Sequence, residues 1–323
     1  MIRMIRWGII GTADIARGGF LPALREAGGG QAWMVASRDL ERARLFASEN
    51  GVAKACGDYN EIVESDEIDA IYIPVPNHAH YEWTMKALQT HKPVLCEKPL
   101  SGVWHQAEAV VKEAQRTRAL LWEAYAFQFQ PQWLRVQDLI REGAVGDALE
   151  IHGTFNTVLG RPEDARWAKA FQGGALNDLG CYPVHVASLL IREDPEDVWA
   201  QAEIPHEVDE SVWGVLRYPS RQQLIMNVSF VRRYDTFTRI VGSAGEIRLS
   251  NTYHPSARDA VSVYSKRGVV KEYTMQGQLP FTDMLRHIHA VARGDSEPMQ
   301  LAADVSLPTA WAMEKIRCHW TPV

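Results

Sequence analysis

The pattern of apolar residues changes once along the chain. Up to about residue 122, short apolar runs alternate with segments in which apolar residues recur every three or four positions. A short apolar run predicts a buried strand, and the longer recurrence predicts a helix with one buried face. The predicted strands are Arg6–Ile10, Ala32–Ala36, Ala70–Pro74, Pro93–Cys96 and Ala119–Trp122. The predicted helices contain Ala16/Phe20/Leu24, Leu40/Ala43/Ala47, Tyr81/Met85/Leu88 and Ala107/Val110/Val111/Ala114. Strict alternation of the two predicts a doubly wound parallel sheet of the α/β class.

Beyond about residue 200, apolar residues alternate with polar ones, which predicts strands with one buried face. These strands are Val212–Tyr218, Leu224–Phe230, Phe237–Val241 and Val261–Tyr264. Short connections such as Gly242–Gly245 favour a large, mostly antiparallel open sheet in an α+β domain. A helix-rich connector precedes this sheet, with Pro131–Arg141 as its clearest helix. We therefore expect domains at residues 1–122 and 123–323, and a homodimer or homotetramer formed through the open sheet.

Composition excludes several classes of function. The 323 residues carry a net charge of -6 without a block of Lys or Arg, so the basic surface that nucleic acid requires is missing. No apolar run approaches the roughly 20 residues that span a bilayer, and the first apolar stretch, Trp7–Ile10, is too short for a signal peptide. The four cysteines are widely spaced, which is typical of a reducing compartment. We expect a soluble, cytoplasmic protein.

The first predicted strand passes into a helix through a turn of small residues. Gly11, Ala13 and Ala16 have the spacing of the Rossmann dinucleotide fingerprint, with Ala13 where a glycine is usual. The first makes the tight turn, the second lets the backbone approach the pyrophosphate, and the third lets the helix pack on the strand. We expect Gly11, Thr12, Ala13 and Ile15 to contact a dinucleotide. A plain strand–turn–helix of small residues is the alternative.

The end of the second predicted strand indicates which dinucleotide is bound. Ser37 and Arg38 stand where a carboxylate would bind the adenosine ribose of NAD. A hydroxyl and a guanidinium suit a 2′-phosphate, so we expect NADP rather than NAD. In the alternative, Arg38 is a solvated surface charge and Asp39 binds the ribose. Asp39 precedes an apolar helical pattern, however, which favours a helix N-cap.

Polar residues follow the fourth and fifth predicted strands, where ligands of open α/β sheets bind. The cofactor-contacting candidates in these loops are Pro74, Asn77, His80, Glu97 and Lys98. Lys98 follows a fully apolar strand, so we expect it to be partly desolvated. Desolvation lowers the pKa of a lysine toward the range useful for proton transfer. An ordinary ion pair between Glu97 and Lys98 is the alternative.

Five motifs occur in order along the chain: Gly8–Thr12, Ala36–Arg38, Pro76–His80, Cys96–Leu100 and Gly173–Pro183. Together they resemble the glucose-fructose oxidoreductase, inositol dehydrogenase and MocA family, usually called Gfo/Idh/MocA, over essentially the whole chain. The resemblance implies a Rossmann domain followed by an α+β domain. It also implies an oxidoreductase that moves a hydride between the nicotinamide of NADP and a sugar, polyol or diol carbon.

Within that family, Gly180–Pro183 is most similar to the NADP-dependent aldose 1-dehydrogenases of the D-xylose type and to the dimeric dihydrodiol dehydrogenases. The resemblance implies that Lys98 and Tyr182 act as general acid/base. The other residues it implies at the site are Asp178, Arg166 and His185 for the substrate and Asn77 and His80 for the nicotinamide. The chain departs from this branch at Gln128 and Gln130, where an arginine and a histidine are common.

Other interpretations remain open. His78 with His80, or Cys181 with His185, could suggest zinc, but neither pair is completed to four ligands, and we expect no metal. The aromatic residues Trp122–Trp133 are typical of a domain core or of a sugar-binding surface. A catalytically silent NADP-binding sensor or scaffold is the main functional alternative, a trans-dihydrodiol dehydrogenase is a second, and a zinc hydrolase is a third.

Overall fold

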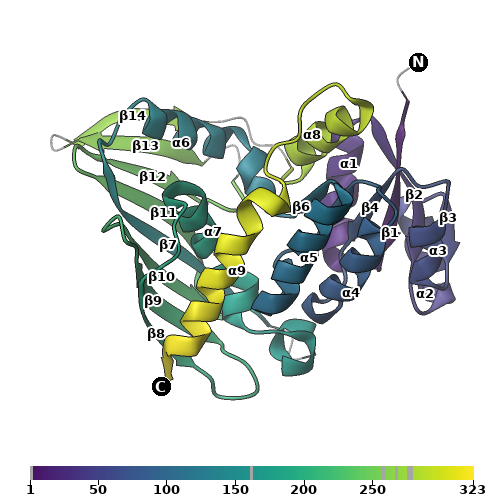
Figure 1. Ribbon diagram of the computed structural model, residues 1–323, viewed down its shortest axis with the longest axis horizontal. Helices are drawn as coiled ribbons and strands as arrows, with labels where there is room; N and C mark the ends of the chain where they lie inside the picture. Colours follow the sequence, from purple (N-terminus) through teal and green to yellow (C-terminus); the bar gives the residue numbers. More distant parts are fainter. Residues whose placement is uncertain (1–2, 161–162, 256–258, 266–267, 275–278) are drawn as a thin grey trace. The chain divides into compact units, whose positions relative to one another are not determined.

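The computed structural model describes residues 3–160, 163–255, 259–265, 268–274 and 279–323. The chain forms two compact units, which we call the first and the second unit (Figure 1). The first unit comprises Met1–Ser101, His105–Ala126 and Leu279–Ser306. The second comprises Gly102–Trp104, Phe127–Gln278 and Leu307–Val323.

The first unit is built on a six-stranded sheet in which every strand pair is parallel. The strand order is β3-β2-β1-β4-β5-β6. The strands are β1 (Ile5–Ile10), β2 (Gly30–Ala36), β3 (Lys54–Cys56), β4 (Ala70–Ile73), β5 (Val94–Cys96) and β6 (Leu121–Glu123). This order confirms the doubly wound parallel sheet that the apolar runs predict.

The predicted helices of the first unit are also present. A turn of π-helix at Ala16–Phe20 continues into α1 (Leu21–Ala27). The other predicted helices are α2 (Leu40–Asn50), α4 (Asn77–Leu88) and α5 (Trp104–Thr117). The unit also contains α3 (Tyr59–Glu64) and α8 (Thr282–Arg293). The sequence pattern did not predict β3 or α3, because β3 is a three-residue edge strand and α3 buries only Ile62 and Val63.

The segment Leu279–Ser306 belongs to the first unit, whereas we expected all of residues 123–323 in the second domain. Buried polar bonds and rings account for this placement. Trp7 Nε1 donates to His289 Nε2 at 2.9 Å, and His289 Nδ1 lies 2.8 Å from the carbonyl oxygen of Gly28. Because an indole can only donate, His289 Nε2 accepts and its Nδ1–H donates to Gly28. Phe281 packs edge-on against Phe20.

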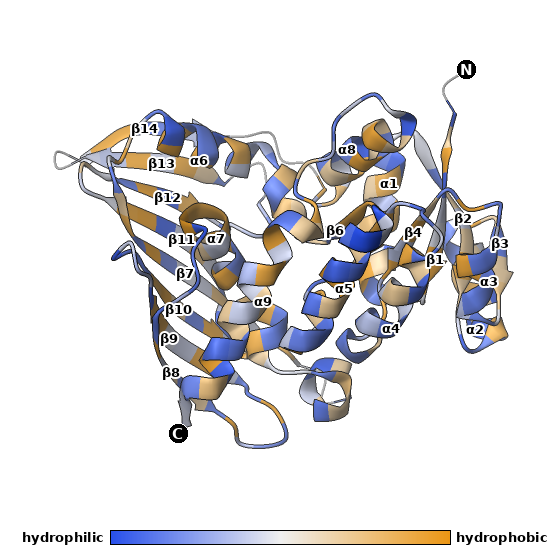
Figure 2. Cartoon of the chain, in the orientation of Figure 1, coloured by the Kyte–Doolittle hydropathy of each residue, from blue (hydrophilic) through white to orange (hydrophobic). Residues whose placement is uncertain are grey.

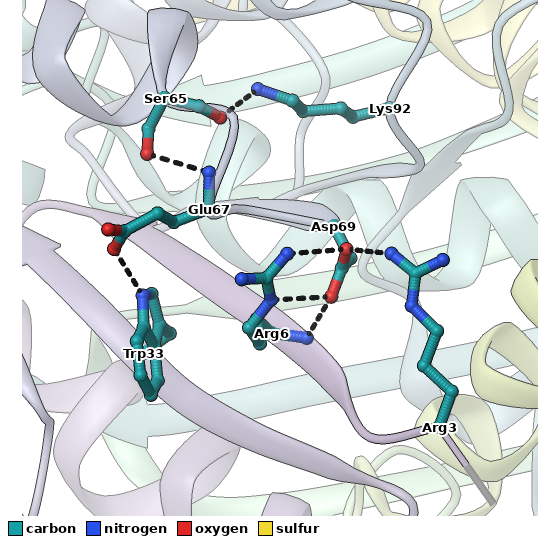
Figure 3. Close-up of polar contacts among 7 residues, drawn as sticks. All are labelled: Arg3, Arg6, Trp33, Ser65, Glu67, Asp69 and Lys92. Carbon is teal, nitrogen blue, oxygen red and sulfur yellow. Dashed lines mark hydrogen bonds and ion pairs between the residues drawn. The ribbon is translucent and has the colours of Figure 1, made fainter.

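At the amino ends of the strands, Asp69 connects the start of β1 to the loop before β4 (Figure 3). Its carboxylate accepts the backbone N–H of Arg6 at 2.9 Å and the Nε–H of the same residue at 3.1 Å. Arg3 donates to it at 2.6 Å. Burial acts to raise the pKa of Asp69, but the hydrogen bonds from Arg6 outweigh it, so the pKa is lowered and the carboxylate stays charged.

The second unit is built on a nine-stranded sheet, in the order β14-β13-β12-β11-β7-β10-β9-β8-β15. The strands are β7 (Ala148–Val158), β8 (Asp197–Glu203), β9 (Ser211–Arg217), β10 (Gln223–Ser229), β11 (Val231–Gly242), β12 (Glu246–Ser250), β13 (Ala260–Ser265), β14 (Gly268–Thr274) and β15 (Trp320–Pro322). Only the β7/β10 and β8/β15 pairs are parallel among those of the described residues. The structure therefore confirms the large, mostly antiparallel sheet.

One face of this sheet is covered by α6 (Pro131–Arg141) and α7 (Cys181–Ile191). The helix predicted at Pro131–Arg141 is thus confirmed. The C-terminal helix α9 (Ala302–His319) contacts α7 through a hydrogen bond between Thr309 and His185. Figure 2 shows apolar and polar residues alternating along the strands. Side chains such as Trp199 and Phe237 on the strands remain exposed.

We predict that Asp69→Ala lowers the free energy of unfolding by about 1–3 kcal/mol, because it leaves a half-buried backbone N–H and guanidinium of Arg6 without their acceptor. Urea unfolding followed by circular dichroism measures this. Arg3→Ala is the matched control, because the Arg3 side chain is 74% exposed and its loss should cost less than about 0.5 kcal/mol. Equal losses in the two variants would contradict the role given to Asp69.

Candidate active site

The candidate residues of the first unit gather at one edge of its sheet. Because all six strands are parallel, the loops that follow β1, β2, β4 and β5 leave from the same edge. The strand order reverses between β1 and β4, and such a reversal is where open α/β sheets bind their ligands. Gly11, Ser37, Val75 and Lys98 each follow one of these strands.

Gly11 makes the turn that leaves β1. Its φ is +115°, a conformation that favours glycine, and a Cβ there would lie 3.3 Å from the side chain of Val75. Its N–H donates to the carbonyl oxygen of Ala36 at 2.9 Å, which ties the turn to β2. Ala16 is fully buried under the turn, while Thr12 and Ala13 are half-buried and Ile15 is 42% exposed. This geometry fits the close approach of a diphosphate.

The loop after β2 separates Asp39 from Arg38. Asp39 is the N-cap of α2, because its carboxylate accepts the backbone N–H groups of Glu41 and Arg42. The N-cap interpretation is therefore confirmed. Ser37 is buried with its hydroxyl oxygen 3.3 Å from the N–H of Asp39, and Arg38 is exposed. Burial and the positive charge of Arg38 lower the pKa of His78, so His78 lies within electrostatic reach of that guanidinium.

The loop after β4 leads into α4, which begins at Asn77. His80, one turn into this helix, is fully buried. Its Nδ1 lies 2.7 Å from the carbonyl oxygen of Pro99, and its Nε2 lies 2.8 Å from that of Val75. Burial lowers the pKa of His80 to about 4. The side chain thus connects two loops from inside, whereas Asn77 and the strand-end residue Pro74 lie at the edge.

The loop after β5 carries Lys98, whose side chain is half-buried. On one side of it, the buried Glu97 accepts a hydrogen bond from the Tyr72 hydroxyl at 2.7 Å. On the other side, the N–H of Leu100 donates to Glu123 at 2.7 Å. Burial raises the pKa of Glu123 to about 7. The Glu97 carboxylate also accepts the backbone N–H of Lys98 at 3.3 Å, so buried carboxylates hold the backbone both at Lys98 and beyond it.

In the second unit, a turn of π-helix at Leu176–Gly180 continues into α7 and carries most of the predicted substrate residues. Asp178, Tyr182 and His185 follow one another at helical spacing, so they share a face. His185 is fully buried, with Nδ1 2.8 Å from the Thr309 hydroxyl. Burial lowers its pKa to about 3, so the imidazole is neutral at physiological pH.

Arg166 connects two carboxylates of the second unit. It donates to Asp164 at 2.9 and 2.8 Å and to Asp178 at 3.2 Å. The hydrogen bond with Asp164 is the main cause that raises the pKa of Arg166, so the guanidinium stays charged. Arg166 therefore fixes the orientation of Asp178, and its own side chain remains 41% exposed.

The ring of Tyr182 is enclosed by other rings. Its centroid lies 4.8 Å from that of Tyr253, 5.3 Å from that of Phe155 and 6.2 Å from that of Phe127. His254 lies 6.1 Å away and is exposed. The ring is 8% exposed. This aromatic enclosure fixes the direction of the phenol ring.

Sequence reasoning missed two residues that position these segments. These residues are Glu123 and Asp209, for neither of which the sequence analysis predicts a role. Asp209 is buried and accepts the N–H of Leu176 at 2.6 Å, at the start of the helix that carries Asp178 and Tyr182. Burial raises its pKa to about 6. Gly174, with φ +108°, lies against this carboxylate. The glycine pair was a local signal for a tight turn, but no signal indicated its distant partner.

The structure groups the predicted residues by unit. Lys98, Glu97 and the dinucleotide turn belong to the first unit, and Tyr182, Asp178, Arg166 and His185 belong to the second. Among the described residues, no group of three or more His, Cys, Asp or Glu side chains could hold a metal ion. No helix in the described ranges is long and apolar enough to cross a membrane.

Comparison with known proteins relates this geometry to a family. Residues 5–125 match the oxidoreductase family model with an NAD-binding Rossmann fold, and residues 133–248 match the GFO/IDH/MocA C-terminal domain. A dTDP-3,4-didehydro-2,6-dideoxy-alpha-D-glucose 3-reductase of Actinomadura kijaniata is 32% identical over 97% of this chain and 92% of its own. A D-xylose 1-dehydrogenase (NADP(+)) of Haloferax volcanii is 30% identical over 89% of this chain and 88% of its own. A trans-1,2-dihydrobenzene-1,2-diol dehydrogenase of Xenopus laevis is 33% identical over 76% of this chain and 74% of its own.

Solved structures agree. A 3-ketoreductase from Actinomadura kijaniata in complex with NADP and TDP-benzene superposes with a TM-score of 0.88, at 27% identity, over 99% of each chain. The resemblance drawn from the sequence motifs is confirmed. The chain belongs to the Gfo/Idh/MocA family of oxidoreductases.

Proposed function

We propose that this protein is an NADP(H)-dependent oxidoreductase that transfers a hydride between the nicotinamide and a sugar, polyol or diol carbon. The observation that carries the proposal is the sheet edge of the first unit. There, the turn at Gly11, whose φ of +115° favours glycine, and the loop with the half-buried Lys98 follow parallel strands on either side of the point where the strand order reverses.

The cofactor would be held by the residues at this edge. The turn at Gly11–Ala13, with Ile15, would contact the diphosphate, and Ser37 with Arg38 would bind the 2′-phosphate of NADP. The Asp39 carboxylate caps α2 through its Oδ1 atom, which supports Ser37 and Arg38 rather than Asp39 as the residues that would face the adenosine ribose. The relatives that name NADP support this preference. Pro74, Asn77 and Glu97 would border the nicotinamide.

The chemistry we propose uses Lys98 and Tyr182 as a general acid/base pair. The nicotinamide supplies the hydride chemistry when bound. An ammonium close to a phenol stabilises its anion, so Tyr182 can take the proton of a substrate hydroxyl as the carbon is oxidised. In reduction the same pair returns a proton, and the charge of Lys98 stabilises the developing alkoxide. Asp178, held by Arg166, would orient the substrate.

The substrate class we favour is one rich in hydroxyl groups. Gln128 and Gln130 are 1% and 5% exposed where related branches carry an arginine and a histidine. An amide donates and accepts hydrogen bonds without charge, which suits hydroxyls. The fully buried His185, whose ring lies edge-on to that of Phe127, would support the segment that carries these two amides. We also propose a homodimer or homotetramer through the exposed side chains of the nine-stranded sheet.

A trans-dihydrodiol dehydrogenase is the second candidate. The aromatic enclosure of Tyr182 and the relative from Xenopus laevis favour it, because rings can bind an aromatic diol by stacking. A silent NADP-binding sensor is less well supported, since the chain keeps both Lys98 and Tyr182. A panel of aldoses, inositols, keto sugars and diols, followed by nicotinamide absorbance, separates the three.

We predict that Lys98→Ala and Tyr182→Phe each lower turnover by roughly 10²- to 10⁴-fold, on the usual scale of general acid/base catalysis. The dissociation constant of NADPH, measured by fluorescence, should change less than about threefold, because neither side chain is proposed to hold the phosphates. Lys112→Ala is the control, an exposed lysine of α5. Turnover near that of the parent in either variant would refute the acid/base role.

We predict that Arg38→Ala weakens NADPH binding by roughly 10- to 100-fold and leaves NADH binding almost unchanged. The reason is that the lost charge-assisted hydrogen bond goes to the 2′-phosphate, which only NADPH carries. Titration calorimetry with both cofactors measures this. Arg42→Ala, in the first turn of α2, is the control. Equal weakening for the two cofactors would show that Arg38 does not recognise the 2′-phosphate.

A further inference from the structure

His80 is a buried histidine that the proposed chemistry does not use. It is fully buried on α4, and both ring nitrogens lie within hydrogen-bond distance of backbone carbonyl oxygens. With both nitrogens occupied and no exposed surface, the side chain has no atom left for a cofactor. We therefore interpret His80 as acting through the backbone rather than by direct contact with the nicotinamide.

The carbonyl group of Pro99 and the N–H of Leu100 belong to one peptide unit. His80 Nδ1 lies 2.7 Å from that carbonyl oxygen. Glu123 accepts that N–H at 2.7 Å. The Pro99–Leu100 peptide, one residue beyond Lys98, is thus held at both of its polar atoms by side chains from α4 and from the end of β6. Buried hydrogen bonds of this kind strengthen one another and restrict the peptide plane.

The two carbonyl groups near His80 differ in how far their backbone is already restricted without a hydrogen bond from the imidazole. Val75 stands between Pro74 and Pro76, whose rings already restrict the backbone. The Pro99 carbonyl lies one residue from Lys98, a side chain with several rotatable bonds. A neutral imidazole carries a single N–H, and burial lowers the pKa of His80 to about 4. At physiological pH, only one of the two carbonyl oxygens therefore accepts a hydrogen bond from His80.

We propose that His80 is a positioning residue for Lys98, and that its Nδ1–H, donated to the Pro99 carbonyl oxygen, sets where the ammonium group lies. Within the proposed oxidoreductase activity, His80 would act only through this backbone contact. A displacement of a catalytic group by about 1 Å can cost roughly 10²-fold in rate.

Two substitutions distinguish the contribution of Nδ1 from that of Nε2. The amide nitrogen of asparagine lies as many bonds from Cα as Nδ1 does, and that of glutamine as many as Nε2. His80→Asn therefore keeps a donor for Pro99, and His80→Gln keeps one for Val75. Lys86→Gln, on the exposed side of α4, is the control and should behave like the parent.

We predict that His80→Gln lowers kcat by roughly 10- to 100-fold, while His80→Asn stays within about threefold of the parent and NADPH affinity is unchanged in both. A second measurement uses the protein without cofactor or substrate. The rate at which acetic anhydride labels Lys98, measured by mass spectrometry against pH and relative to Lys112, should change in His80→Gln and not in His80→Asn.

The opposite ranking of the two variants would overturn the proposal, and so would an equal effect in both, including unfolding of both. The labelling measurement does not depend on enzymatic activity, so it tests the positioning role independently of the proposed function. If the parent turns over no substrate of the panel, the oxidoreductase proposal fails while labelling still decides whether His80 positions Lys98. If turnover is present and labelling of Lys98 is unchanged in His80→Gln, the positioning role fails alone.

Discussion

The segments proposed to carry the chemistry depend on buried carboxylates that satisfy backbone N–H groups. Glu123 accepts the N–H of Leu100 beside Lys98, and Asp209 accepts the N–H of Leu176 at the start of the helix with Tyr182. A buried N–H without a partner costs about 1–3 kcal/mol, so each carboxylate fixes its segment in place.

These carboxylates are not optimal for stability. Burial raises the pKa of Glu123 to about 7 and that of Asp209 to about 6. A carboxyl group whose pKa is higher in the folded than in the unfolded chain favours folding fully below the unfolded pKa. That contribution is lost as the pH rises through the folded value. The stability of the fold therefore falls as the pH rises from about 4 through the two folded pKa values, and it stays lowered at higher pH. The two groups nevertheless retain a geometry that apolar side chains could not provide.

Much of the fold could be predicted from the sequence, because its strands are buried or alternate regularly. The parallel, doubly wound sheet of the first unit was predictable from the alternation of helical patterns with apolar runs such as Arg6–Ile10 and Ala70–Pro74. The return of Leu279–Ser306 to that unit could not be predicted, since it depends on contacts such as Trp7 with His289, which lie far apart in the sequence. The edge strand β3 is too short to produce a pattern.

The candidate site shows the same division. Gly11 and Asp39 were predictable because a turn and a helix cap are local, and the structure gives both the expected geometry. The orientation of His80 was not, because its partners are carbonyl groups that carry no side-chain signal. Asp209 was invisible for the same reason, since its partner is the backbone of a distant helix start.

The burial of these positioning groups explains why a lysine can serve at the site. A lysine side chain loses about 2 kcal/mol of rotamer freedom when it is fixed, and few direct contacts could hold its ammonium without blocking the substrate. Holding the flanking peptide limits the volume that the ammonium can explore. Tyr182 illustrates the other solution, because neighbouring rings enclose a side chain that is already rigid. The flexible group is therefore fixed through its backbone and the rigid group through its ring.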